Sequence, residues 1–346
     1  MICAQYDELV GKQLLHDILD TRGVLLIPIE TILTDAHIEK LQQFRIDVMD
    51  IHVEELDWPA DQAPSRESEE RKWVHHTESK LKEIETFIEK NGKVPTEEIE
   101  RTILPVILNV SGQSNIYKLF TQLKAGADYR YNHSIGVAIM ATTIGRWMKL
   151  DEPELHLLTT AASLCDIGMI KLPSGLLQKT TGLMPHEYEI MKQHTVMGHQ
   201  LLLDSGVDSR VALIALQHHE REDGSGYPNR LTGSQLDPLS RIVGLADMYM
   251  AMTTERPHRA AMPFYQVVTQ LFDEITLGRL ESNLGLTFLS RLMSAQIGSD
   301  IILSDGRRGR IVLNNTNYPN RPFIKVGNEF IDLSKTGAVR IKEIVG

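Results

Sequence analysis

Six side chains of the types that bind transition metals stand in separate, mainly apolar segments of the chain. They are His133, Asp166, His194, His218, His219 and Asp247. Imidazole nitrogens and carboxylate oxygens bind Fe, Mn, Zn or Ni, and helices that converge in a bundle can gather them around one or two ions. Each residue alone would equally fit a hydrogen-bonded core or surface position. Asp247 is harder to explain that way, because its frame GLADMYMAM is apolar and a buried carboxylate needs a cation.

The segment HHEREDGSGYP carries the most specific pattern in the chain. Two adjacent histidines, His218 and His219, precede a turn that contains glycines, Tyr227 and Pro228. Glycine and proline also end ordinary helices, so the turn alone would not identify a site. The whole segment resembles the signature of the HD-GYP family, which runs roughly HHE-R-x-DG-x-GYP. The resemblance covers residues 125–265, through YNHS, AASLCDIG, MKQHTVMGH and SRIVGLADMYMAM.

This resemblance implies a metal-dependent phosphodiesterase that hydrolyses cyclic di-GMP in bacterial second-messenger signalling. It makes Asp166 the catalytic residue, bridging two divalent ions, with Fe or Mn favoured and Zn or Ni as alternatives. His194, His218 and His219 would complete the shell of one ion, and His133 and Asp247 would hold the other. Two cations close together lower the pKa of water and stabilise charge on phosphate oxygens, which suits attack on a phosphodiester.

The resemblance also assigns residues to the ligand. Arg256 and Arg259, in TTERPHRAA, match positions where the family carries basic ligand-contacting residues. A guanidinium offers a planar fork of donors that suits phosphate oxygens. Tyr227 of the GYP turn is expected to shape the ligand cleft and a surface for signalling partners. The alternative, that Tyr227 only packs the turn, stays open.

Three positions depart from the family pattern. Cys165 stands in place of the histidine of the His-Asp dyad, so it is either a further ligand through its thiolate or a small apolar core residue. Met169 replaces a lysine, and methionine neither donates a proton nor neutralises charge. Lys171 is close in sequence but faces elsewhere if the segment is helical. Tyr129 replaces a glutamate that would permit a third ion, so two ions at most are expected.

These departures leave three functions open. The retained ligand set favours a cyclic di-GMP phosphodiesterase, with activity impaired to some degree. Cys165 and Met169 favour instead a catalytically degenerate module that binds cyclic di-GMP or partner proteins. A third alternative is a phosphohydrolase acting on another nucleotide, because an HD scaffold by itself does not name its substrate.

The elements that position these residues are mainly helical. Between residues 96 and 293, apolar residues recur at three- and four-residue spacings, which predicts an HD-type helical bundle. Residues 1–55 alternate short apolar runs with turns and predict a small β-rich module, and the polar residues 56–95 predict a linker leading into helix. Residues 298–346 are rich in β-branched residues and turn pairs, which predicts a small β module. The expected fold class is therefore mainly α, with two small β-rich modules.

The overall charge narrows the ligands that this chain can bind. Its 346 residues carry a net charge of -10, which argues against DNA as a partner because non-specific DNA binding depends on many basic contacts. An anionic ligand would need a locally positive pocket. No signal-peptide pattern and no apolar run of membrane-spanning length appears, so we expect no membrane insertion and a cytoplasmic protein with free thiols at Cys3 and Cys165. A homodimer is also expected.

Overall fold

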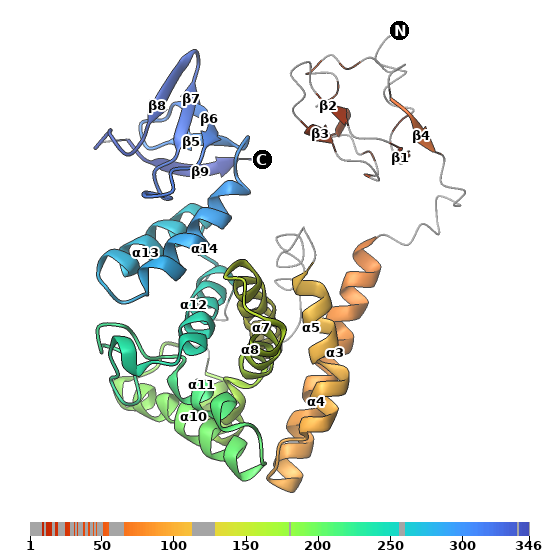
Figure 1. Ribbon diagram of the computed structural model, residues 1–346, viewed down its shortest axis with the longest axis vertical. Coiled ribbons are helices and arrows are strands. Elements are labelled where there is room, and N and C mark those ends of the chain that lie inside the picture. Colours follow the sequence, from red (N-terminus) through yellow and green to blue (C-terminus); the bar gives the residue numbers. More distant parts are fainter. Residues whose placement is uncertain are drawn as a thin grey trace. The chain divides into compact units, whose positions relative to one another are not determined.

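The computed structural model describes residues 66–112, 129–179, 181–255, 260–337 and 339–345, together with short stretches between residues 9 and 54 (Figure 1). The chain forms two compact units, Met1–Glu67 and Ser68–Gly346, and each has its own apolar core. None of the described helices is long and apolar enough to cross a membrane.

The N-terminal unit contains short antiparallel strand pairs. β1 (Gln13–Leu14) pairs with β4 (Val53–Glu54), and β2 (Ile18–Leu19) pairs with β3 (Leu25–Ile27). Its core consists of buried aliphatic side chains, among them Leu14, Ile27, Leu33 and Leu41. The described part of this unit therefore agrees with the small β-rich module that the sequence predicts.

The second unit is mainly helical, as predicted. Its longer helices are α3 (Arg66–Asn91), α7 (Tyr129–Trp147), α8 (Glu152–Leu164), α10 (Pro185–Asp204), α12 (Pro238–Thr253), α13 (Phe264–Thr276) and α14 (Ser282–Ser294). Shorter elements are α4 (Thr96–Thr102), α5 (Leu104–Ser111), α9 (Ser174–Leu177), α11 (Ser209–Gln217) and the 3-10 turns η2 (Ile167–Lys171) and η3 (Gly233–Gln235). α3 lies within the predicted polar linker, yet its Ile84 and Ile88 are buried in the core of this unit.

α7 runs through the middle of this core, packed against α8 and α12. Most α7 residues from Asn132 to Gly145 are buried, which explains why apolar residues occupy all its faces rather than a single stripe. The side chains of Asp151, Asp208 and Asp237 cap α8, α11 and α12 by accepting backbone N–H bonds. These caps fix the residue at which each helix begins. They thereby fix the position of the polar residues along each helix axis.

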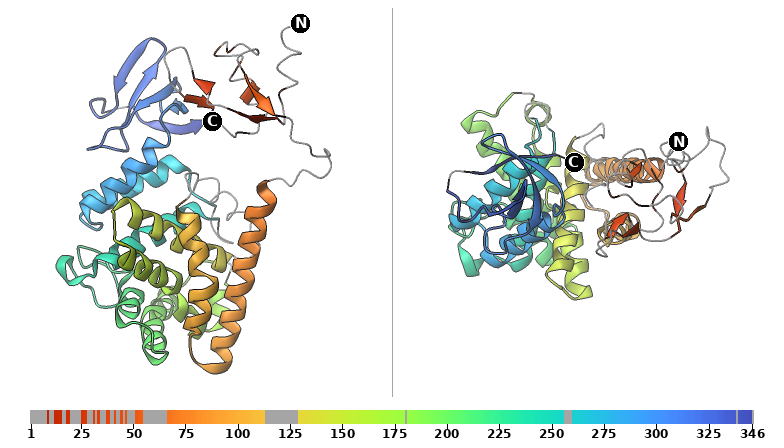
Figure 2. Two further views of the ribbon diagram at one scale, coloured as in Figure 1. Left: turned by 45° about the vertical axis from the view of Figure 1, so that its right-hand side comes forward. Right: turned by 90° about the horizontal axis from the view of Figure 1, so that it is seen from above.

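A five-stranded antiparallel sheet ends the second unit. Its strands are β5 (Asp300–Leu303), β6 (Arg308–Leu313), β7 (Phe323–Val326), β8 (Glu329–Asp332) and β9 (Ile341–Val345), in the order β8-β7-β6-β5-β9. Ile301, Leu303, Ile311 and Ile324 are buried in the core and alternate with half-buried or exposed residues. β9 packs against α13, so the sheet continues the core of the helices rather than standing apart (Figure 2).

Candidate metal centre

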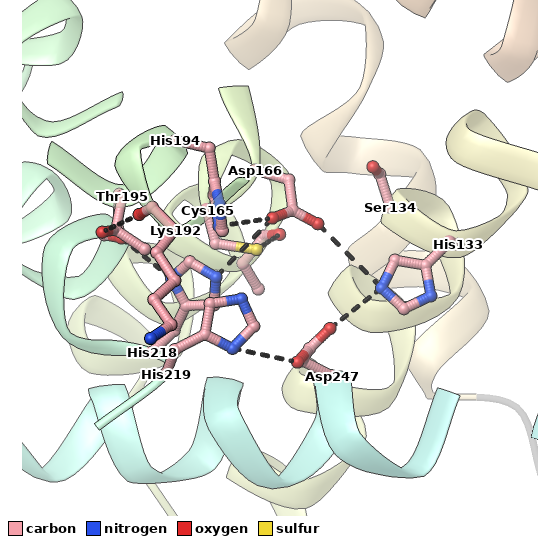
Figure 3. A network of polar contacts seen from close by, with 12 residues as sticks. His133, Ser134, Cys165, Asp166, Lys192, His194, Thr195, His218, His219 and Asp247 are labelled. Carbon is pink, nitrogen blue, oxygen red and sulfur yellow. Dashed lines mark hydrogen bonds and ion pairs between the residues drawn. The ribbon is translucent and has the colours of Figure 1, made fainter. Parts of the chain in front are cut away.

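The six predicted metal ligands come together from five parts of the helical unit (Figure 3). His133 lies on α7, Asp166 in the turn between α8 and η2, His194 on α10, His218 and His219 directly after α11, and Asp247 on α12. They form two groups whose ligand atoms lie within 4.8 Å of one another, and Asp166 belongs to both. One group adds His194, His218 and His219 to Asp166, and the other adds His133 and Asp247.

Two rings of the three-histidine group meet at one carboxylate oxygen. His194 Nε2 lies 3.3 Å and His218 Nε2 lies 3.6 Å from Asp166 Oδ1. On the far side of each ring, Nδ1 lies 2.7 Å from the Met191 carbonyl or 2.8 Å from the Ala215 carbonyl. A carbonyl only accepts hydrogen bonds, so each Nδ1 carries its hydrogen and donates it. Such a bond sets the tautomer and leaves Nε2 to face the centre.

The atoms that face the centre are buried and unpaired among the described residues. They are His194 Nε2, His218 Nε2 and Asp166 Oδ1. In neutral imidazoles of this tautomer, two nitrogen lone pairs would oppose a carboxylate lone pair, which is unfavourable unless a cation lies between them. A divalent metal ion supplies that cation, and the donor set therefore fits one.

The second group meets the other oxygen of the shared carboxylate. His133 Nε2 is 4.0 Å from Asp166 Oδ2 and forms a hydrogen bond of 2.9 Å with Asp247 Oδ1. The remaining oxygen of Asp247, Oδ2, lies 3.6 Å from His219 Nδ1. Asp166 thus presents one oxygen to each group, which is the arrangement that a bridging carboxylate requires.

The electrostatics of the centre favour ionised carboxylates. Burial alone would raise the pKa of Asp166, but the neighbouring rings of His194 and His218 outweigh burial and hold that pKa well below its ordinary value. Burial likewise opposes ionisation of Asp247, and the hydrogen bond from His133 lowers the pKa of Asp247 below its ordinary value. Burial opposes the charged form of His194, but Asp166 outweighs burial and raises the pKa of that ring.

Backbone contacts fix the distances between the ligands. Gly168 follows Asp166 by two residues and packs directly on α10, so that a Cβ at this position would lie 2.0 Å from the His194 carbonyl oxygen and 2.5 Å from the Gly198 nitrogen. A Cβ at Gly244 would meet the His218 carbonyl at 2.5 Å. Only glycine allows these approaches. They bring the chain around Asp166 against α10, and α12 against the turn that carries His218.

Cys165 belongs to neither group of ligand atoms. It is 1% exposed, lies in the main apolar core, and donates its S–H to the Ala162 carbonyl over 3.3 Å. Burial, followed by the charges of Asp166 and Asp247, raises the pKa of the Cys165 thiol well above its ordinary value. Since only the thiolate is a good ligand, this environment favours the core-filling role over the ligand role.

A cleft of about 1240 Å³ opens beside the ligands, and Asp166, His133, His194, His219 and Asp247 reach its wall. Its described basic residues are Arg130, Lys179, Arg221 and Arg279, and its acidic residues are Glu85, Glu89, Asp166, Asp247 and Glu274. The described side chains therefore do not make the cleft positive by themselves. Without bound cations, it lacks the locally positive character that an anionic ligand needs.

The other two departures from the family pattern, Met169 and Tyr129, both line the cleft. Met169 lines the cleft, so the methionine faces the space where a lysine would meet the ligand. Lys171 ends η2, is exposed, and is not part of the cleft wall, so it does not replace the missing cation. Tyr129 also lines the cleft, with its ring 5.6 Å from that of His133.

The GYP turn is fastened by Glu220, a residue that the sequence analysis did not single out. Glu220 is 5% exposed, and its carboxylate accepts the backbone N–H of Asn229 at 2.6 Å and of Leu231 at 3.1 Å. Gly226 packs on the Glu220 backbone so closely that a Cβ would lie 2.4 Å from the Glu220 Cα. In the sequence, Glu220 is marked only by its position after the two histidines. That position does not predict its hydrogen bonds with Asn229 and Leu231, which lie nine and eleven residues further on.

Tyr227 is held by this turn against the metal ligands. Its backbone N–H donates to the His219 carbonyl at 3.2 Å, and its ring stacks on His219 with centroids 4.7 Å apart. It also lines the cleft, so both roles that the sequence left open, packing and cleft shaping, apply to one side chain. Arg256 and Arg259, the predicted ligand-contacting arginines, lie outside the described residues.

Comparison with known proteins agrees with this geometry. A family model described as HD domain matches residues 115–276. The chain is 28% identical over 206 residues to a cyclic di-GMP phosphodiesterase of Pseudomonas aeruginosa, covering 59% of this chain and 49% of that protein. It is 34% identical over 173 residues to a cyclic di-GMP phosphodiesterase of Thermotoga maritima, covering 48% of this chain and 46% of that protein.

Among solved structures, the fold is similar to that of an HDG"Y"P protein from Bdellovibrio bacteriovorus, with a TM-score of 0.53 and 16% identity over 82% of this chain and 96% of that one. The chain spans about half the length or less of the curated relatives that it matches. The family match covers the region that carries the six ligands and the GYP turn. Residues 115–276 of the chain are therefore similar to the HD domain family, and the solved structure shares the fold.

Proposed function

We propose that this chain is a metal-dependent phosphodiesterase that hydrolyses cyclic di-GMP or a closely related cyclic dinucleotide. The observation that carries the proposal is the pair of ligand groups that share Asp166, with buried and unpaired ring nitrogens turned toward that carboxylate. Hydrogen bonding within the site does not account for His194 and His218, because their Nε2 atoms and the Asp166 Oδ1 that they face have no hydrogen-bond partner among the described residues.

The two groups would hold two divalent ions, with Fe or Mn favoured by the mixed nitrogen and oxygen donors. His194, His218, His219 and Asp166 would hold one ion, and His133, Asp247 and Asp166 the other. When bound, two such ions lower the pKa of water and neutralise charge on phosphate oxygens. The chain itself orients the imidazoles through the carbonyls of Met191 and Ala215. The neighbouring histidines also lower the pKa of Asp166 and of Asp247 against the effect of burial, so both carboxylates can serve as ligands.

A cyclic dinucleotide suits the site in size, and bound ions would supply the positive charge that its phosphates need. The cleft volume of about 1240 Å³ is larger than that of ordinary small-molecule sites, which span about 300–1,000 Å³, and leaves room for a dinucleotide. Several relatives carry the name cyclic di-GMP phosphodiesterase, and one from Vibrio cholerae, 32% identical over 158 residues, is named a 3'3'-cGAMP-specific phosphodiesterase. Both substrates present two phosphodiesters, so the distinction between them would lie in the recognition of the bases.

The test is turnover by anaerobically purified chain with measured metal content, supplied with Fe or Mn and separately with cyclic di-GMP or 3'3'-cGAMP. Chromatography of the products distinguishes a linear dinucleotide from mononucleotides. We expect hydrolysis that requires added metal and stops after chelation. Folded, metal-loaded protein that hydrolyses neither substrate would overturn the proposal.

A catalytically degenerate module that binds without turnover is the second candidate, and Met169 is the observation that favours it. Met169 faces the cleft, and of the four described basic residues there, Arg130, Lys179 and Arg279 are already paired with carboxylates. Met169→Lys would add a cation at the cleft wall and is expected to raise turnover, since a well-placed donor is worth about 10²–10³ in rate. Binding of cyclic di-GMP without turnover, in the wild type and in Met169→Lys alike, would favour the binding module.

Three further expectations remain predictions. A signalling partner would dock on the surface of the GYP turn, the chain would pair as a homodimer, and it would act in the cytoplasm.

A phosphohydrolase acting on another nucleotide would be recognised by competition, if cyclic di-GMP failed to displace that nucleotide. Arg256 and Arg259 keep their proposed role as phosphate contacts, for which a selective loss of ligand affinity in Arg259→Ala would be the evidence.

A further inference from the structure

A row of aromatic rings leads from the metal ligands into the cleft. The Tyr227 ring stacks on His219, with 4.7 Å between centroids and 29° between planes. Tyr188 of α10 meets Tyr227 edge-on, with 6.4 Å between centroids and 77° between planes. Tyr188 lines the cleft and is 47% exposed, whereas Tyr227 is only partly exposed. The row therefore ends in a large aromatic face that is open to the cleft.

The orientation of Tyr188 is fixed by its neighbours. Lys192 lies one helical turn further along α10 and places its Nζ 4.9 Å from the centre of the Tyr188 ring. The same Nζ is 2.7 Å from Glu189 Oε1 and 5.6 Å from the centre of the Tyr227 ring. A cation over an aromatic face is an attractive contact. Tyr188 is thus held between Lys192 and Tyr227 in the absence of any ligand.

Tyr188 also stands at a fixed distance from the metal ligands. It precedes His194 by six residues on the same continuous helix, which corresponds to about 9 Å along the helix axis. The helix is anchored at this end by Glu187, whose carboxylate accepts the backbone N–H of Met184 and pairs with Lys179. A ligand phosphate near His194 therefore has an aromatic ring beside it at a set offset.

Packing does not account for this side chain. A tyrosine that only fills space is mostly buried, as Tyr249 and Tyr265 of this chain are at 4% and 7% exposure. We propose that Tyr188 is the platform on which one purine base of the cyclic dinucleotide stacks, while a phosphodiester of the same molecule lies at the metal ligands. This inference rests on the proposed function and adds a base-recognition residue to it. Stacking on an aromatic side chain suits any purine, because every base has a π-face.

The test compares Tyr188→Ala and Tyr188→Phe with the matched control Ile190→Ala. Ile190 lies two residues away on the same helix, is 42% exposed, and is not part of the cleft wall. Equilibrium dialysis of the metal-loaded full chain would measure the Kd of a phosphorothioate analogue of cyclic di-GMP, which resists hydrolysis. Ribose 5-phosphate, which has a phosphate and no base, is the second ligand.

Tyr188→Ala is expected to weaken binding of the analogue by about 5- to 150-fold, the range for loss of one base stack. Binding of ribose 5-phosphate should change far less, and metal content should match the wild type. Tyr188→Phe should bind almost as well as wild type, because stacking needs the ring and not the hydroxyl, and Ile190→Ala should show no change.

Two results would overturn the platform. One is analogue binding by Tyr188→Ala that equals the wild type, and the other is an equal loss for both ligands together with a loss of metal, which would mean a structural role. Failure of the proposed function looks different, because metal-loaded wild type would then not hydrolyse cyclic di-GMP, whether or not Tyr188→Ala weakens binding of the analogue.

Discussion

The two halves of the metal centre are prepared to different degrees. In the three-histidine half, His194 and His218 donate from Nδ1 to backbone carbonyls, so their Nε2 atoms already face Asp166 in the form that binds a metal. In the other half, His133 uses Nε2 for a hydrogen bond of 2.9 Å with Asp247. Its Nδ1 is buried without a partner among the described residues. The three-histidine half is therefore preorganised for a metal ion. The other half must first break the hydrogen bond between His133 and Asp247 before it can bind one.

This difference implies an order of filling. To present a lone pair at Nε2, His133 must carry its hydrogen on Nδ1, where no described group accepts it. An unsatisfied buried polar group costs about 1–3 kcal/mol. That cost corresponds to about 5- to 150-fold in affinity, since each 1.4 kcal/mol is a factor of ten. We therefore expect the three-histidine half to bind its ion first and more tightly.

The largest effect is expected at the residue that both halves share. Asp166→Ala should abolish binding of both ions and lower turnover by more than about 100-fold, the upper end of what loss of an outer-shell partner costs a metal site. Metal analysis and turnover measure this. Asp151→Ala is a matched control, because that aspartate caps α8 and its loss should cost about 1 kcal/mol of stability while metal content stays normal. An Asp166→Ala protein that keeps an ion would show that the halves are independent.

Removing one ligand from each half tests the order of filling directly. His133→Ala should lose the weaker ion and keep the tighter one, whereas His218→Ala should lose the tighter ion. Calorimetric titration of the metal-free chain would give two steps in the wild type and one step in each variant. If His133→Ala removed the tighter step instead, the proposed asymmetry would be reversed.

A smaller effect is expected from the residue that fastens the GYP turn. Glu220→Gln keeps one acceptor oxygen and loses the other, so the turn that holds Tyr227 on His219 should loosen. We expect metal affinity to fall by about 10- to 100-fold in the three-histidine half, as for other residues that orient ligands. The step assigned to His133 should move less, and equal losses in both steps would mean general destabilisation.

The smallest effect is expected at Cys165. Because its thiol lies in the apolar core and outside both ligand groups, Cys165→Ala should leave metal content and the order of filling unchanged. The free energy of unfolding should fall by about 1 kcal/mol, as is usual for a single substitution. Loss of an ion from Cys165→Ala would restore the alternative in which this cysteine is a ligand.

The sequence predicted the mainly helical fold and the β-rich ends because both depend on local periodicity. It also named all the residues that now face one another across the centre, because the family pattern fixes their order and spacing. Contacts between backbone segments that are far apart in the chain could not be predicted from the sequence. The hydrogen bonds of Glu220 to Asn229 and Leu231, and the tautomers imposed by Met191 and Ala215, depend on how the turns and helices are placed in space.

The choice between roles for a single residue also needed the structure. Burial of Cys165 favours its core-filling role, whereas Tyr227 both stacks on His219 and lines the cleft, so its two interpretations are compatible. Tyr188 gave no signal, because an aromatic residue on an amphipathic helix is ordinary in sequence and becomes informative only when its exposure and its neighbours are known.

The close approach of Gly168 to α10 bears on how this site can change over evolutionary time. Because the Gly168 backbone lies directly against the backbone around His194 and Gly198, Asp166 and α10 form one rigid piece that substitutions elsewhere cannot easily spread apart. Side chains along the cleft, such as Met169, are not part of that piece. The wall of the cleft is therefore free to vary in lineages that keep the metal geometry, so that new ligand preferences can arise without rebuilding the centre.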